Sequence, residues 1–206
     1  PKWIIGFSDA TVFHVHINHN YGIATIHSKM CNSFPEDFST AEQIQIDSID
    51  SIRQCLVGKK MKYERPENEN NRNGEGVGAL VGGNLSIIQN LTGSISNLHT
   101  EGKILFIEDV GEYLYKIDGM LWNLKRSRKL DRLKGLIVGE FKIKPDDPGE
   151  EFGKNIYEMV MEKVKKYHYP VCFDFPVGHV KENYALKCGV KHRLEVTDNW
   201  VMLKEM

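Results

Sequence analysis

Short apolar runs alternate with longer amphipathic stretches along this chain. Six runs have the length and composition of buried strands, at 3–5, 23–26, 79–81, 104–107, 136–138 and 170–175. Apolar residues at helical spacing predict helices that start near residue 9 and over 40–57, 85–91, 113–129 and 152–164. Strands that alternate with helices in this way predict an α/β fold.

The remaining segments are predicted to form loops and a hairpin. Segment 63–76 holds Pro66 and a run of Glu and Asn, which predicts a mobile surface loop. Short strand patterns over 184–203 surround Gly189 and predict antiparallel pairing. The basic residues of 125–129 are expected to form a solvated helix end that suits the helix dipole.

Composition narrows the class of protein without choosing its activity. The 206 residues carry a formal net charge of -1, so we expect no affinity for nucleic acid or membranes. No apolar run approaches the about 18 residues of a membrane span. The four cysteines are scattered, which predicts reduced core thiols. These features predict a soluble intracellular protein.

Four histidines lie near the start of the chain. On a helix, His16 and His19 share one face while His14 points away, and two ligands are too few for zinc. We therefore predict no metal site and no cofactor, with these histidines on a polar helix surface or a pocket wall.

Three short blocks carry candidate chemistry. Ser8 follows an apolar run and precedes a helix, which is where a sharp strand-to-helix turn exposes a nucleophile. A serine hydroxyl needs a base and a group that orients the base, and His179 and Glu108 can fill these roles. Taken singly, Ser8 could be an N-cap, Glu108 a salt-bridge partner and His179 a loop histidine.

Two further features bear on a substrate pocket. The backbone N–H of Asp9, directly after Ser8, could stabilise an oxyanion, although Asp9 could equally be an N-cap. Gly83 and Asn84 stand at the start of a helix, where free N–H groups can bind a carboxylate; a plain capped turn is the alternative.

These blocks resemble the LD-carboxypeptidases, which are also called muramoyltetrapeptide carboxypeptidases, and the related microcin C self-immunity proteins. The matching blocks are 6–9, 81–85, 102–109 and 175–179. The resemblance implies that Ser8 is the nucleophile, Glu108 the acid and His179 the base of a serine peptidase. It also implies cleavage of the L,D-peptide bond before the terminal D-Ala of murein tetrapeptides, in cytoplasmic cell-wall recycling. A microcin C-type amide hydrolase and a non-catalytic murein-peptide binder are the alternatives.

The resemblance also implies an architecture. Residues 1–30 are expected to be the nucleophile strand, turn and helix of an N-terminal Rossmann-like domain, and residues 31–206 a layered β/β/α C-terminal domain. The chain is expected to be a fragment without the upstream loop that gives the second oxyanion donor. Because losing one donor costs about 10²–10³ in turnover, the fragment is expected to be weakly active or inactive. The resemblance allows a homodimer.

The sequence departs from the family pattern at one place near the nucleophile. His27-Ser28-Lys29-Met30 stands where many members have Gly-Pro-Met. This departure could alter the substrate pocket or only its wall, so it bears on substrate specificity.

Overall fold

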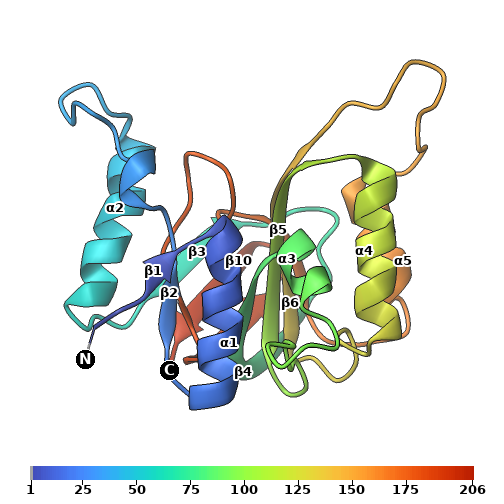
Figure 1. The fold of residues 1–206 in the computed structure, drawn as a ribbon, viewed down its shortest axis with the longest axis horizontal. Helices are drawn as coiled ribbons and strands as arrows, with labels where there is room; N and C mark the ends of the chain where they lie inside the picture. Colours follow the sequence, from blue (N-terminus) through green and yellow to red (C-terminus); the bar gives the residue numbers. More distant parts are fainter. Residues whose placement is uncertain (1) are drawn as a thin grey trace.

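The computed structural model describes residues 2–206 and contains a seven-stranded sheet (Figure 1). Its strand order is β3-β10-β9-β4-β5-β6-β7. The strands are β3 (Lys62–Pro66), β4 (Gly74–Asn84), β5 (Ile104–Glu112), β6 (Gly135–Ile143), β7 (Val171–Phe175), β9 (Lys191–Val196) and β10 (Trp200–Glu205). Strands β4 to β7 are parallel, whereas β9, β10 and β3 extend the sheet in antiparallel fashion. The carboxyl ends of β4 to β7 therefore meet at one edge.

The two faces of this sheet carry separate apolar cores, because successive side chains of a strand point to opposite faces. In β5, Leu105 and Ile107 belong to one core, and Ile104 and Phe106 to the other. All four side chains are completely buried. This burial on both faces explains the continuous apolar run in the sequence.

Helices cover the first face. They are α1 (Thr11–Tyr21), α3 (Leu85–Asn90), α4 (Leu114–Arg126) and α5 (Ile156–Val164). Each contributes buried side chains to that core, including Val15, Ile88, Leu121 and Val160. Helices α4 and α5 lie side by side (Figure 1).

A second, three-stranded sheet lies on the other face. It consists of β1 (Ile5–Gly6), β2 (Thr25–His27) and β8 (Leu186–Cys188), in the order β1-β2-β8. Helix α2 (Gln43–Leu56) packs into the same core through Ile52 and Cys55. Strands β1 and β2 are parallel, and β8 pairs with β2 in antiparallel fashion. Segments near both ends of the chain thus share one sheet. The expected domain boundary at residue 30 stays a prediction.

The mixed α/β architecture confirms the predicted fold class, while several local predictions were wrong. Segment 63–76 is not a mobile loop, because β3 and β4 occupy its ends and Arg72 exchanges two backbone hydrogen bonds with Val171, at 2.9 and 3.0 Å. Helix α5 begins at Ile156 instead of 152, because Asn155 caps it by accepting from the Glu158 N–H at 2.9 Å.

Two polar side chains also differ from expectation. Lys129 of the predicted solvated segment is buried and donates to the Leu98 carbonyl at 3.0 Å. Of the four cysteines, Cys31 is exposed, whereas the other three are buried thiols as expected.

Within residues 2–206, no helix is long and apolar enough to cross a membrane. The same residues hold no cluster of three or more His, Cys, Asp or Glu side chains that could bind a metal ion.

Candidate active site

The candidate base and acid are in direct contact. His179 Nδ1 lies 2.8 Å from Glu108 Oε2. Glu108 is completely buried, while the side chain of His179 is 18% exposed. Burial raises the pKa of Glu108, and its contact with His179 opposes that rise. With Nδ1–H donating to the carboxylate, Nε2 is left free to accept a proton, as a general base requires.

The position of Glu108 follows from the sheet. It lies in β5 near the shared carboxyl edge and pairs with Asn84 of β4. The neighbouring strand β6 carries one extra residue between Val138 and Phe141, so the register shifts beside Glu108. Such bulges bend a strand locally and re-aim side chains near active sites.

Two glycines allow the His179 loop to reach Glu108. A Cβ on Gly139 would lie 2.5 Å from the Val177 carbonyl oxygen, and one on Gly178 would lie 3.1 Å from Glu108 Cβ. Gly178 also has a φ of 128°, which side-chain-bearing residues rarely adopt. The Glu140 N–H donates to the Val177 carbonyl at 3.0 Å and fixes this close approach.

Ser8 occupies a strained turn between β1 and α1. Its φ is 59°, and residues Ser8–Ala10 form one 3-10 turn before α1 begins. A non-glycine residue in this region costs about 1–3 kcal/mol, and such strain is typical of a nucleophile elbow. Gly6 permits the sharp turn, because a Cβ there would lie 2.7 Å from Ala10 Cβ.

His14 supports this turn as a buried side chain, where the sequence predicted a polar helix surface or a pocket wall. It is 2% exposed, with Nε2 2.9 Å from the Gly6 carbonyl and Nδ1 2.9 Å from the Thr25 hydroxyl. The carbonyl can only accept, so Nε2 carries the proton and the hydroxyl donates to Nδ1. Burial lowers the pKa of His14, consistent with a neutral ring that joins α1, β1 and β2.

The Ser8 turn lies against His179 through an aromatic contact. The ring of Phe7 packs on the imidazole of His179, with centroids 4.8 Å apart. Ser8 is half-buried, and no hydrogen bond joins its hydroxyl to His179 in the described part of the chain. Catalytic hydrogen bonds often tighten only when substrate binds. The structure thus brings the three predicted residues into one region and joins two of them directly.

Sequence comparisons identify the family to which these features belong. A model of the LD-carboxypeptidase C-terminal domain matches residues 77–194, and a model of the N-terminal domain matches residues 1–28. The chain belongs to the LD-carboxypeptidase family.

Individual relatives agree with this assignment. The chain is 30% identical over 200 residues to a murein tetrapeptide carboxypeptidase of Pseudomonas aeruginosa, covering 95% of this chain and 63% of that protein. It is 26% identical over 235 residues to the microcin C7 self-immunity protein of Escherichia coli, covering 100% of this chain and 66% of that protein. The chain therefore spans a little under two thirds of the length of these relatives.

Solved structures confirm the fold. The muramoyltetrapeptide carboxypeptidase of Oxalobacter formigenes superimposes with a TM-score of 0.84 at 24% identity, over 99% of this chain and 68% of that one. The microcin C7 self-immunity protein gives a TM-score of 0.81 at 23% identity, over 100% of this chain and 68% of its own.

The polar atoms of Asn84, the predicted pocket residue of this family member, are engaged within the fold. Its Oδ1 accepts from the Ile87 N–H at 3.2 Å, and its Nδ2 donates to Asp109 Oδ1 at 2.9 Å. Its backbone N–H donates to the Thr11 hydroxyl at 3.0 Å, and a Cβ on Gly83 would lie 2.4 Å from that hydroxyl. These contacts make both residues junctions between α1, β4 and β5, and contact with substrate stays a prediction.

Asp109 and Thr11 were not singled out from the sequence, although both organise the site. Asp109 is 2% exposed, and its Oδ2 accepts from the Ser86 N–H at 3.0 Å and hydroxyl at 2.7 Å. The Glu108-Asp109 pair, which follows the apolar run of β5, was the available signal. The carboxylate of Glu108 contacts His179, and that of Asp109 holds the start of α3.

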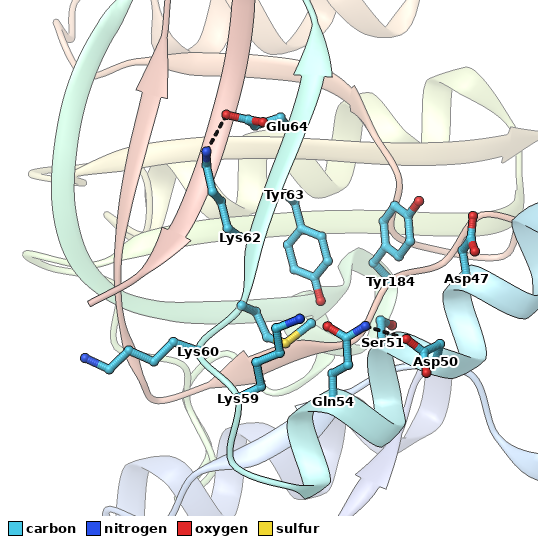
Figure 2. A pocket seen from close by; sticks show the side chains of 11 residues that line it. Asp47, Asp50, Ser51, Gln54, Lys59, Lys60, Lys62, Tyr63, Glu64 and Tyr184 are labelled. Atoms are coloured by element: carbon cyan, nitrogen blue, oxygen red, sulfur yellow. Dashed lines mark hydrogen bonds and ion pairs between the residues drawn. The ribbon is translucent and has the colours of Figure 1, made fainter.

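Another cavity lies apart from these residues. Its volume is about 400 Å³, and it lies between α2 and β3, with Tyr63 stacked on Tyr184 at a centroid distance of 5.1 Å (Figure 2). None of Ser8, Glu108 and His179 lines it. This cavity is therefore separate from the candidate active site.

Proposed function

We propose that the protein carrying this chain is a serine carboxypeptidase that cleaves the L,D-peptide bond before the terminal D-Ala of murein tetrapeptides. The hydrogen bond of 2.8 Å between His179 and Glu108, beside the strained turn of Ser8, is the observation that carries the proposal. The murein tetrapeptide carboxypeptidase among the relatives supports this substrate class. Cytoplasmic cell-wall recycling is the setting that the proposal assigns.

The proposed reaction runs through an acyl-enzyme. Ser8 Oγ attacks the carbonyl carbon of the L-centre while His179 Nε2 takes the hydroxyl proton. His179 then gives this proton to the D-Ala nitrogen as the C–N bond breaks, which leaves an ester on Ser8. A water molecule, deprotonated by His179, attacks the ester, and the proton returns to Ser8 Oγ when the C–O bond breaks.

Two other groups assist without forming bonds to the substrate. Glu108 stays ionised and holds His179 in the tautomer that exposes Nε2. The backbone N–H of Asp9, at the start of the 3-10 turn, is the proposed donor to the oxyanion, because the first N–H groups of a helical turn lack helical partners.

A second candidate is a microcin C-type amide hydrolase. The relative of 26% identity that spans the whole of this chain supports it, and the same acyl transfer would serve. A non-catalytic binder of murein peptides is disfavoured, because binding alone does not require a buried carboxylate aligned on a histidine next to a strained serine.

The direct test measures D-alanine release from a murein tetrapeptide by mass spectrometry, using the complete protein. We expect Ser8→Ala to lower turnover by about 10⁴–10⁶-fold with little loss of peptide binding. Ser39→Ala, which changes an exposed serine, is the matched control and should match wild type. Turnover by Ser8→Ala within tenfold of wild type would exclude Ser8 as the nucleophile.

A further inference from the structure

Lys29 lies beside the nucleophile turn. It follows β2, which runs parallel to β1 with Gly6 opposite His27, and the Ser28 N–H donates to the Gly6 carbonyl at 2.9 Å. Because the strands are parallel, Lys29 leaves β2 at the same edge at which Ser8 leaves β1. The next residue, Met30, is also close, since a Cβ on Gly6 would lie 3.5 Å from its sulfur.

The ammonium of Lys29 lacks the partners that other buried lysines have. In residues 2–206, Lys129 donates to a carbonyl, Lys163 pairs with Asp118, and Lys187 pairs with Glu205. Lys29 is 7% exposed, yet no carboxylate lies within 4.0 Å of its ammonium and no hydrogen bond engages it in the described chain. The side chain is mostly buried, but its Nζ still reaches solvent, so this unpaired ammonium is available to a ligand of opposite charge.

The surroundings of Lys29 are positively charged. Burial lowers the pKa of Lys29, and the nearby charges of Lys142 and Lys181 lower it further. Lys142 lies near the end of β6, and Lys181 follows His179 by two residues and pairs with Glu42. The charges of Lys142 and Lys181 therefore act on Lys29 from two other segments, and Glu42 offsets part of the Lys181 charge. A cluster of one sign beside a site attracts an anion.

We propose that Lys29 forms an anion subsite beside Ser8 that binds the α-carboxylate of the C-terminal residue released by cleavage. This rests on the proposed function. The α-carboxylate belongs to the residue directly after the scissile bond, about one Cα–Cα step of 3.8 Å away. Paired strands lie about 4.8 Å apart, so a lysine beside Ser8 in the β1–β2 register can span that distance. Such a subsite restricts cleavage to the last peptide bond. Lys29 also belongs to the segment His27-Ser28-Lys29-Met30, which stands where many family members have Gly-Pro-Met.

The test compares two peptides that differ only at the C-terminus, a murein tetrapeptide with a free D-Ala carboxylate and its carboxamide. We expect Lys29→Met in the complete protein to lower kcat/KM for the acid by about 10–100-fold, the worth of one charged hydrogen bond. Its kcat/KM for the carboxamide should stay within about threefold of wild type. Lys29→Arg should keep most of the preference for the acid, and Lys144→Met, which changes an exposed lysine directly after β6, should keep all of it.

Several outcomes would overturn the subsite. Equal losses on both peptides indicate a structural role for Lys29, and an unchanged preference for the acid in folded Lys29→Met removes its contact with the carboxylate. If Lys29→Met does not fold, wild-type protein that cleaves and binds both peptides equally well overturns the proposal on its own.

Binding separates this proposal from the proposed function. Calorimetry with Ser8→Ala should show tighter binding of the acid than of the carboxamide, and adding Lys29→Met should abolish the difference. If wild type cleaves neither peptide, the proposed function fails, while the binding preference and its loss still decide the subsite.

Discussion

Glu108 lies on a long strand of the large sheet and His179 lies in the loop after β7 of that sheet, whereas Ser8 follows a short strand of the small sheet. Strands β5 and β6 each have nine residues, and Glu108, which lies in β5, is completely buried. Strands β1 and β2 have two and three residues, and Ser8 is half-buried after β1. The two halves meet where Phe7 packs on His179.

The difference shows how each half achieves its geometry. Close backbone packing through Gly139 and Gly178 fixes the histidine loop on Glu108. The serine turn is held by side-chain hydrogen bonds, chiefly those of His14 to Gly6 and Thr25. Changes in the first half should therefore affect turnover more than stability, and changes in the second half should affect both.

The largest effect on the acid–base half is expected from Glu108→Gln. The amide keeps the size of the side chain but no longer favours the tautomer with a proton on Nδ1, so turnover should fall by about 10³–10⁴-fold. D-alanine release and thermal unfolding would be measured together, with Glu112→Gln on the same strand as the control. Turnover by Glu108→Gln close to that of wild type would remove Glu108 from the triad.

Gly178→Ala should have the next largest effect on turnover. The new Cβ would lie 3.1 Å from Glu108 Cβ at a φ of 128°, so the loop must move and displace His179. A displacement of about 1 Å can cost about 10²-fold. The matched control is Gly102→Ala, which has a φ of 71° and no atom within 4 Å of its added Cβ.

Both glycine variants should lose about 1–2 kcal/mol of unfolding free energy because of the backbone conformation. Only Gly178→Ala should lose turnover. Equal turnover in the two variants would contradict the role of this close approach in placing His179.

In the nucleophile half, His14→Leu should destabilise the fold by about 2–3 kcal/mol, because it removes two hydrogen bonds and leaves the Gly6 carbonyl without this donor. Urea unfolding measures this change, and His99→Gln at an exposed position should stay within about 0.5 kcal/mol of wild type. Turnover should fall as well, since the same ring supports the Ser8 turn. A stable His14→Leu with full turnover would contradict this account of the turn.

The smallest expected effect concerns pH and His27. Both ring nitrogens of this completely buried side chain lack hydrogen-bond partners in the described structure. Burial lowers its pKa well below the usual value, and the charges of His14 and His179 add to the effect. Below a pH of about 6.5, His27 therefore binds a proton in the unfolded chain but stays neutral in the folded chain. The free energy of unfolding thus falls as pH falls.

Between a pH of about 7.5 and 5.5, wild type should lose about 1 kcal/mol more unfolding free energy than His27→Phe, since one pKa unit corresponds to about 1.4 kcal/mol. Phenylalanine suits the site because the rings of Phe7 and Phe106 already surround His27. His14 stays in both proteins, so the difference isolates His27. Parallel pH profiles of the two proteins would contradict a neutral buried His27.

The sequence indicated much of the fold because buried parallel strands such as β5 consist of continuous apolar runs. It missed the length of β4, because Gly76 and Gly78 are unfavourable in strands by propensity. Tertiary packing requires glycine at both positions. A Cβ on Gly76 would lie 1.6 Å from the Lys134 carbonyl oxygen, and a Cβ on Gly78 would lie 2.6 Å from the Gly102 carbonyl oxygen. Helical spacing alone likewise could not reveal that His14 is buried, because its partners come from β1 and β2.

The candidate site, like the fold, could be predicted from the sequence only in part. Ser8, Glu108 and His179 were predicted because short motifs carry them, and the structure joins His179 to Glu108. The unpaired ammonium of Lys29 could not be found in this way. Burial and partners are properties of the folded chain, and the motif departure at 27–30 was the only trace in the sequence.

The central claim is that Ser8 is a nucleophile activated by His179 and Glu108. Labelling of the complete protein with a fluorophosphonate probe, followed by peptide mass spectrometry, tests it most directly. We predict one adduct on Ser8 in wild type, and no adduct on Ser8 in His179→Ala. A folded protein that releases D-alanine but carries its adduct on another residue, or carries none, would contradict the account.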